Sequence, residues 1–514
     1  MGISHQALFT KLRDDEAVRR GVQYAYWTLP ALMANLDSNH GKALLERDYQ
    51  EIGAILVNYL SSKLAGLLFP STRPFFKIAP SDKLVQDASN VGVSKDKLVA
   101  QLARMETTAC SQLFQNASYN QLILALKHLI VTGNALTYRD TIAHRTTTYG
   151  LQSYVTRRDG HGVLLDCVLR EYTYVEALPS EIRAALVQSN RAMYSRPEQE
   201  ITLYTRIRRE VGDAVKYVVT QEVDTVPVGY TNSYPEHLCP FQALTWNLIP
   251  GEHYGRGMVE DYAGGFAKLS DLSEAHALYA VEVMRVIHIV QAGSGTDIDD
   301  IANAETGEYV AGTKDSITVH ESGDGTKLQQ VASEIAQITT RLSTAFMYGS
   351  NTRDAERVTA HEIAQQALAA ETALGGNYSS LAESWQVPMS HVLLYESKPD
   401  VLEGLINKDL KLDVIAGIPA LGRAADVQNL LSATQEAAAM VNTLAQIDRR
   451  IDPQKVFDMI MAGQSVDTTM LFKSDEQLRK EDEANAQIQQ GQQQALQAQQ
   501  VLAQASSLDQ LQQG

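Results

Sequence analysis

The sequence predicts an α+β fold that is mainly helical, with a mixed α/β body and a long antiparallel helical hairpin. Two observations carry this prediction. Residues 149–228 alternate apolar and polar side chains with a period of two, which is typical of half-buried strands. Residues 262–290 and 328–345 instead carry apolar residues at alternating intervals of three and four, which is typical of helices packed along a seam.

Composition excludes several classes of protein. The 514 residues include 61 acidic and 44 basic side chains, a net charge of −17, whereas a general nucleic-acid binder needs a basic excess. The three cysteines lie far apart and form no CxxC pair, which argues against a disulfide framework and a zinc ribbon. No run of 18 apolar residues occurs and the N-terminus is no signal peptide, so we expect no membrane insertion.

The first 250 residues predict the mixed body. Helices are expected across 96–131, ending at the Gly133-Asn134 stop and followed by a strand over 135–139. Strands are expected over 151–156 and 163–175, and over 201–207 and 215–223 around the Gly212-Asp213 turn. A short helix is expected between the two pairs, at 180–187.

The two seams predict the hairpin. Taken as one helix, residues 257–291 would be about 50 Å long, which is more than a small domain can cover. The glycine-rich stretch 292–327 between the seams holds strand-like pieces at 308–311 and 317–320, so it predicts a compact tip. Two interpretations stay open: a helical hairpin buried within one domain, or packing against other copies of the chain. The seam residues expected to pack are Phe266, Leu269, Leu272, Tyr279, Val283, Val286, Ile335, Ile338 and Leu342.

Beyond the hairpin the signals are shorter. The polar loop 349–357 is followed by a helix start at Thr359, with Glu362 completing a capping box. That helix either breaks at Gly375-Gly376 or continues to Pro388. Residues 424–463 are helical in pattern, and 486–513 hold 13 Gln among 28 residues, typical of a solvated helix or of a self-assembly segment.

No catalytic constellation stands out, so neither enzymatic activity nor a cofactor is expected. His361-Glu362 lacks the second His of a zinc-protease helix, and Gly323–Lys327 lacks the spacing of a phosphate-binding loop. Asp297, Asp299 and Asp300 suggest a cation site, but Ile301 stands where a calcium loop needs a ligand. A carboxylate site assembled from distant residues leaves no local motif, so a soluble enzyme stays the least favoured alternative.

Several segments, in this order, resemble the head-to-tail connector (portal) proteins of short-tailed bacteriophages. The most distinctive are YGRG at 254–257, RLSTAFM at 341–347 and ERVTAHEI at 356–363. Others are LSSKLAGLLFP at 60–70, ALKHLIVTGN at 125–134, SYVTRRD at 153–159, ALPSEIR at 177–183, GGNY at 375–378 and ALGR at 420–423. The resemblance covers residues 50–435.

This resemblance implies a phage portal fold with seven parts. Residues 1–255 would form an α/β wing, to which 358–415 return. Residues 256–291 and 327–348 would be the two stem helices, 292–326 a small α/β clip, and 349–357 a tunnel loop. Residues 416–472 would form a helical crown, and 473–514 a Gln-rich tail.

The function implied is a virion portal at one capsid vertex, made in the host cytoplasm. The subunits, usually twelve, would form a ring around a channel. A separate terminase would pump double-stranded DNA in through this channel, and the DNA would later leave through it into the host. The implied partners are the terminase large subunit, tail adaptor or nozzle proteins, major capsid and scaffolding proteins, and internal core proteins at the crown. Clip docking would involve Asp297, Asp299, Asp300, Glu308 and Lys314.

In the tunnel loop, Asn351, Arg353 and Arg357 would face the DNA. The two arginines either contact phosphates or pair with Asp354, Glu356 or a neighbouring subunit, and both interpretations stay open. The acidic chain suits a conduit through which DNA slides, because each neutralised phosphate adds affinity. The main alternative function is a non-viral coiled-coil scaffold protein, which would bury the same seams without leaving a channel.

Overall fold

A computed structural model describes most of the first 414 residues. The chain divides into two units, Met1–Leu421 and Gly422–Gly514, and every described residue belongs to the first. The crown and tail expected at 416–472 and 473–514 therefore lie outside the described residues. The structure describes residues 3–34, 46–71, 73–188, 192–284, 286–291, 297–309, 315, 317–321, 325–349, 372, 374, 376–397, 405 and 410–414.

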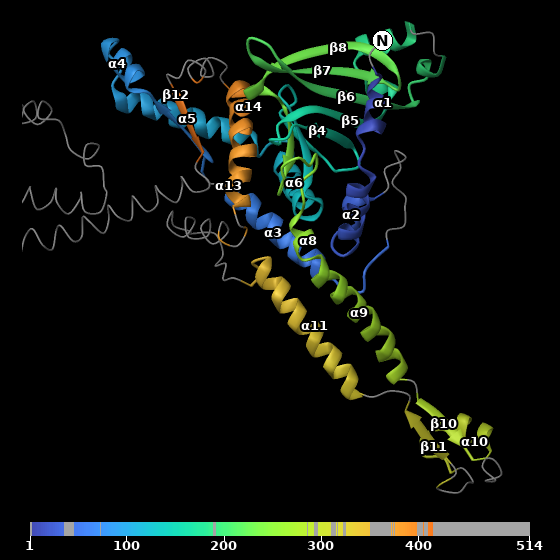
Figure 1. Cartoon of the computed structure of the whole chain (residues 1–514). Helices are drawn as coiled ribbons and strands as arrows, with labels where there is room; N and C mark the ends of the chain where they lie inside the picture. The colour runs from blue at the N-terminus through green and yellow to red at the C-terminus, as the bar shows by residue number, and fades with distance from the viewer. Residues whose placement is uncertain are drawn as a thin grey trace, which may run out of the picture. The chain divides into compact units, whose positions relative to one another are not determined.

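The largest sheet has five antiparallel strands in the order β4-β5-β6-β7-β8 (Figure 1). Its strands are β4 Tyr154–Arg158, β5 Leu164–Tyr174, β6 Glu200–Val211, β7 Val215–Val223 and β8 Val226–Pro235. The strands expected from the period of two are confirmed, since Ile201 and Ile207 in β6 and Val219 and Val223 in β7 are buried. Strand β8 was not among the strands predicted from the sequence.

A second sheet has three antiparallel strands in the order β3-β2-β9 and is packed against helix α6. It contains the strand expected at 135–139. The elements are α6 Ser118–Thr132, β2 Asn134–Asp140, β3 Arg145–Tyr149 and β9 Phe241–Thr245. Gly133 ends α6 with φ +78°, a left-handed conformation that glycine adopts without steric cost.

The main apolar core joins helices from distant parts of the sequence. They are α3 Ile52–Leu68, α5 Lys95–Gln112, α13 Asn377–Leu381, a π-helical turn Ala382–Gln386 and α14 Val387–Ser397. Phe69 and Trp385 pack edge to face with ring centroids 5.0 Å apart. A helix begins at Asn377, directly after the left-handed Gly376 (φ +91°), and continues past Pro388. A proline ring crowds the carbonyl four residues before it, and here that carbonyl lies in the wider π turn, which accommodates the proline.

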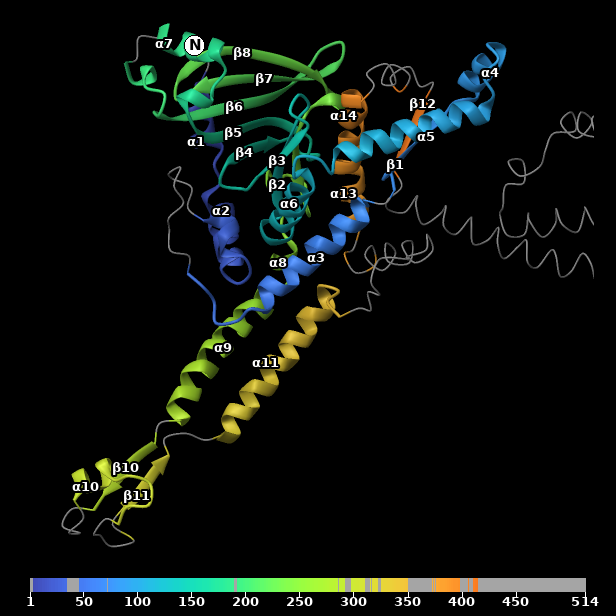
Figure 2. The same ribbon diagram turned by 180° about the vertical axis from the view of Figure 1, so that it is seen from behind.

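The N-terminal residues form two helices that cover the body. Helix α1 His5–Leu12 lies against β4, β5 and β6, and α2 Asp15–Tyr26 contacts α6 (Figure 2). Ser4 and Asp14 cap the two helices through side-chain bonds to backbone N–H groups. Phe9 packs on Tyr204, and the guanidinium of Arg170 lies 5.0 Å from the Phe9 ring centroid.

The single helix expected over 257–291 is wrong. The chain forms α8 Met258–Asp261, a break at Tyr262, and then α9 Ala263–Val283. After Val283 it becomes strand β10 Val286–Val290, which pairs antiparallel with β11 Ile317–Glu321. The β-branched run at 286–290 fits a strand better than a helix. Helix α10 Ile298–Asn303 lies between these strands in sequence, and α11 Gly325–Ala345 follows them and packs on α9.

Smaller elements complete the described chain. Strand β1 Phe76–Pro80 pairs with β12 Leu410–Val414, α4 Asp82–Asn90 packs on α5, and α7 Ser180–Gln188 packs on β8. The strand expected at 308–311 is not seen at Glu308 and Tyr309, and its remaining residues lie outside the described part.

His128 on α6 gives a pH prediction. Its side chain is buried, which lowers the pKa from 6.5 to about 4. As pH falls below about 6.5 the unfolded chain takes up this proton first, so the folded state loses stability until about pH 4. We expect a loss of about 2 kcal/mol of unfolding free energy between pH 7 and pH 5. Urea unfolding of the wild type and His128→Leu at both pH values measures it.

The control for this prediction is His161, which lies exposed on a turn. Replacing His161 with Leu should leave the pH dependence as in the wild type, whereas His128→Leu should flatten it. An equal pH dependence in wild type and His128→Leu would contradict the assignment.

Candidate functional site

The root of the α9–α11 hairpin is a place where two backbone segments almost touch. A Cβ atom on Gly133 would lie 2.4 Å from the carbonyl carbon of Arg256, and one on Gly255 would lie 2.7 Å from the oxygen of Gly133. Real Cβ atoms do not approach so closely. The glycines of the 125–134 and 254–257 segments are therefore required by this crossing.

Asn134 links the two crossing segments by hydrogen bonds. Its buried side chain donates to the Gly255 carbonyl and accepts from the Gly255 N–H, both at 2.8 Å. Next to it, Arg256 binds Glu252 and Glu260 at 2.8 Å each, and the bond to Glu252 is the main cause of its raised pKa. The start of the hairpin is thus fixed to the end of α6 and the beginning of β2.

The hairpin itself is packed within one chain. Phe266 and Leu269 of α9 and Ile338 and Leu342 of α11 are buried, and Phe266 packs edge to face on Phe346 at 5.8 Å. Lys268 and Glu334 form an ion pair across the two helices. Phe266, Leu269, Ile338 and Leu342 are therefore covered by the contact between α9 and α11 of the same copy, and packing of the hairpin against other copies stays a prediction.

The other seam residues occupy different positions. Leu272, Tyr279, Val283 and Ile335 are half-buried on the two helices, whereas Val286 lies in strand β10 and not in the helix. These residues lie further from the root, where the hairpin has fewer neighbours. Their part in packing between copies stays a prediction.

An open cleft lies beside the root, between the first turns of α9 and the last turns of α11. It has a volume of about 510 Å³ and is lined by Asp261, Tyr262, Gly264, Gly265, Lys268, Ile338, Arg341 and Leu342. Gly264 leaves open space above the helix, and burial raises the pKa of Asp261. The cleft is lined by one acid and two cationic side chains, Asp261, Lys268 and Arg341, together with apolar residues.

The expected clip residues lie around α10. Asp297 caps this helix by accepting from the Asp299 N–H at 2.9 Å, and Asp300 lies in its first turn. Glu308 accepts from the Glu305 N–H at 2.8 Å. All four acids named for docking are exposed, while Lys314 lies outside the described residues.

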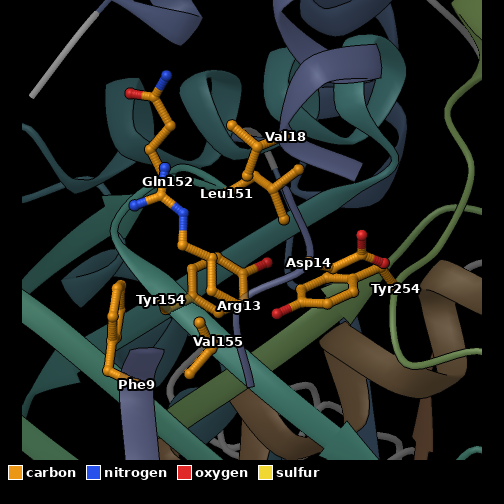
Figure 3. Close-up of a pocket in the computed structure, with 9 residues that line it drawn as sticks. All are labelled: Phe9, Arg13, Asp14, Val18, Leu151, Gln152, Tyr154, Val155 and Tyr254. Atoms are coloured by element: carbon orange, nitrogen blue, oxygen red, sulfur yellow. The ribbon is translucent and has the colours of Figure 1, made fainter. Parts of the chain in front are cut away.

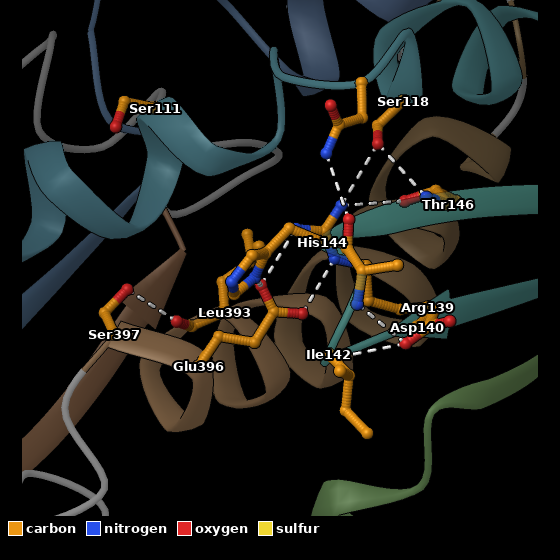
Figure 4. A network of polar contacts seen from close by, with 12 residues as sticks. Ser111, Ser118, Arg139, Asp140, Ile142, His144, Thr146, Leu393, Glu396 and Ser397 are labelled. Atoms are coloured by element: carbon orange, nitrogen blue, oxygen red, sulfur yellow. Dashed lines mark hydrogen bonds and ion pairs between the residues drawn. The ribbon is translucent and has the colours of Figure 1, made fainter.

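Helix α14 is held to the second sheet by a buried ion pair (Figure 4). Arg139 of β2 donates through Nε and Nη2 to the two carboxylate oxygens of Glu396, each at 2.8 Å. The two side chains are 1% and 0% exposed. Arg139 Nη1 also reaches Ser118 and Thr146, and His144 lies 3.2 Å from Glu396. These partners join residues 257 positions apart, and no local motif signals them.

Another close-up shows an enclosed gap under the N-terminal helices (Figure 3). Its volume is about 10 Å³, roughly the space of one water molecule. The hydroxyl of Tyr254 lies at its edge, where it accepts from Thr156 N at 3.2 Å and donates to Leu12 O at 3.4 Å. This gap fits no cofactor or substrate.

The cysteine thiols and two carboxylates of the described residues are buried or hydrogen-bonded within the fold. Cys110, Cys167 and Cys239 are buried, and burial raises the pKa of Cys110 and of Cys239 to about 12. Glu106 accepts from Ile78 N at 2.7 Å, and Glu171 accepts from Tyr149 at 2.6 Å. In the part of the chain that the structure describes, no three His, Cys, Asp or Glu side chains could hold a metal ion. No helix there is long and apolar enough to cross a membrane.

The tunnel loop expected at 349–357 falls almost entirely outside the described residues. Asn351, Arg353 and Arg357 lie outside the described residues, which end at Gly349 and resume at 372. Their role stays a prediction.

The chain matches the family model described as bacteriophage head to tail connecting protein over residues 14–471. It is 42% identical to the portal protein of Pseudomonas phage phiKMV over 96% of this chain and 95% of that one. The portal protein of Enterobacteria phage SP6 is 31% identical over 92% and 90% of the two chains. For Escherichia phage T7 the identity is 30% over 83% and 80%. The match extends over most of the length and beyond the segments that first indicated it, so the chain belongs to the family of bacteriophage head-to-tail connecting proteins.

Proposed function

We propose that about twelve copies of this chain form a closed ring around a channel for double-stranded DNA. The observation that carries the proposal is the near full-length similarity to portal proteins at 42% identity. The chain is a structural virion protein of the portal vertex, where it joins the head to the tail. The ring, the DNA and the packaging terminase go beyond this assignment and are what the experiments below address.

The hairpin supports the ring as its stem. Helices α9 and α11 pack against each other along one side only. A ring of identical hairpins would cover their remaining sides by heterologous contacts between neighbouring copies. In this proposal α10, β10 and β11 form the clip, whose exposed acids Asp297, Asp299, Asp300 and Glu308 dock a terminase or tail adaptor with a basic surface. Residues 416–472 form the crown, next to internal core proteins, and capsid and scaffolding proteins contact the wing.

The net charge supports passage of DNA over retention. Each phosphate that a protein neutralises adds salt-dependent affinity, and a chain with net charge −17 offers few such contacts. The protein contributes a wall and a docking platform, and the energy for packaging comes from the terminase.

Imaging the purified full-length chain tests the ring. Negative-stain microscopy should show rings with a central hole, and native mass spectrometry should give a mass near twelve times the 56.5 kDa subunit. A stable monomer or dimer at micromolar concentration would refute the proposal. Filaments without a hole would favour a coiled-coil scaffold instead.

Arg353 and Arg357 test the tunnel loop. The double variant Arg353→Glu/Arg357→Glu should still form rings but package or retain less DNA, because two cations near phosphates become anions. Quantitative PCR of nuclease-protected genomes in complemented particles measures this. The matched control changes charge equally at two exposed arginines of the wing, Arg104→Glu/Arg145→Glu. Normal packaging and ejection by the loop variant would show that the loop does not act on DNA.

A further inference from the structure

The lower half of α9 carries an apolar stripe on the side that faces away from α11. Leu278, Val281 and Met284 are 60%, 66% and 73% exposed. At about 100° per residue, Leu278 and Val281 lie opposite Leu269 and Leu272, which face α11. Met284 is the C-cap residue that follows α9. Three large apolar side chains exposed within seven residues of the chain mark a contact surface.

The stripe is surrounded by unpaired acids. Asp271, Glu274 and Glu282 lie on the same outward side of α9, are exposed, and form no ion pair within the described residues. The one lysine of α9, Lys268, is already paired with Glu334 of α11. The outward side of α9 is therefore apolar at its centre and acidic at its margins.

The outward side of α11 has the complementary character. Its exposed residues opposite the seam are small or uncharged, namely Gln329, Ser333, Ala336 and Thr340. Thr340 already donates its hydroxyl to the Ala336 carbonyl, so its polar group needs no water when covered. The one acid of α11, Glu334, is paired with Lys268, so the outward side of α11 presents no acid to the acids of a neighbouring α9.

We propose that the stripe Leu278, Val281 and Met284 packs on the outward side of α11 in the next copy of the chain. This inference rests on the proposed ring and names the surfaces that close its stem. A ring contact needs two different surfaces on each copy, and α9 supplies an apolar one with acidic margins while α11 supplies one of small, uncharged side chains. An α9-to-α9 contact would instead set three acids against three acids. Small side chains on α11 let the helix axes approach closely.

The packing of α9 on α11 gives the height along the ring axis at which α9 of one copy meets α11 of the next. A Cβ atom on Gly265 of α9 would lie 3.3 Å from Leu342 of the antiparallel α11, so Leu278, thirteen residues further along α9, stands level with Gln329, thirteen residues before Leu342. A rotation about a ring axis keeps each residue at its height. Leu278 therefore meets the neighbouring α11 near Gln329.

Val281→Asp tests the stripe in the full-length chain. Burying an unpaired carboxylate there should lower the association constant of each interface at least ~10-fold, so rings disappear at concentrations where the wild type forms them. Circular dichroism should stay unchanged, because Val281 is exposed in the single copy. The matched control is Val211→Asp, since Val211 is 72% exposed at the end of β6 and lies outside the stem. Its rings should persist.

A cysteine pair tests whether α11 of the next copy is the partner of the stripe. Leu278→Cys/Gln329→Cys should give a ladder of disulfide-linked multimers on non-reducing gels after mild oxidation, while either single variant gives dimers at most. The three natural cysteines are buried and contribute little background. A double variant that stays monomeric, or that yields no species beyond the dimer, would overturn the assignment of α11 as the partner.

The outcomes separate this inference from the proposed function. If the wild type forms rings and Val281→Asp forms them equally well, the inference fails and the portal assignment stands. If the wild type forms no rings, the proposed function fails first. Loss of rings in both Val281→Asp and Val211→Asp would mean that any added charge disrupts assembly, which also overturns the inference.

Discussion

Glu396→Ala is expected to destabilise the chain by about 3–5 kcal/mol, because it leaves the guanidinium of Arg139 buried without its partner. The two side chains are almost completely excluded from water, so Arg139 cannot recover its hydration without opening the contact between β2 and α14. The remaining partners of Arg139, Ser118 and Thr146, carry no charge. Chemical unfolding of the full-length chain, followed by circular dichroism, gives the free energy.

Two controls separate burial from the loss of any ion pair. The double variant Arg139→Met/Glu396→Leu removes both charges and should cost much less than Glu396→Ala, because no charge is left unpaired. Glu236→Ala breaks the more exposed pair with Arg209, at 3.2 Å, and should cost less than about 1 kcal/mol. Equal losses for Glu396→Ala and Glu236→Ala would contradict the importance of burial at this site.

Gly133→Ala should be the other severe substitution. Gly133 has a φ of +78°, and an added Cβ would lie 2.4 Å from the backbone of Arg256. Backbone strain of about 1 kcal/mol adds to a clash that neither segment can relieve by rotating a side chain. We expect a loss of about 3 kcal/mol or more of unfolding free energy, together with fewer rings, because the crossing sets where the hairpin leaves the body.

Gly92 provides the matched control, since its φ is +84° and no atom lies within 4 Å of an added Cβ. Gly92→Ala therefore measures the cost of the left-handed backbone alone, about 1 kcal/mol. The difference between the two variants is the cost of the clash. If Gly133→Ala proved no worse than Gly92→Ala, the close crossing of 133 and 255–257 would be wrong.

Much of the fold was predictable because local patterns report the periodicity of the backbone. The strands β5, β6 and β7, the helices α5 and α6 and the stop at Gly133 all follow from side-chain spacing or from the special backbone of glycine. The family was also predictable, since ordered short segments indicated it and near full-length relatives bear it out.

The error at the end of α9 shows where such patterns fail. Apolar residues at 283, 286 and 290 satisfy a helical seam, yet the chain leaves the helix after Val283. The run at 286–290 contains four β-branched residues, a signal that favours a strand. What completes the strand is its partner β11, some thirty residues further along the chain, and periodicity within one segment carries no information about that partner.

The features of the candidate site also fall into those that local patterns predict and those that distant contacts decide. By itself, the sequence determined the helical hairpin, the acidic segment at its tip and the family to which the chain belongs. Only the tertiary structure decided that Phe266, Leu269, Ile338 and Leu342 are used within one copy, which leaves Leu278, Val281 and Met284 exposed. It also decided that Arg139 meets Glu396. The physical reason is that spacing reveals which side chains share a face, whereas the partner that covers that face is set by contacts between residues far apart in the chain.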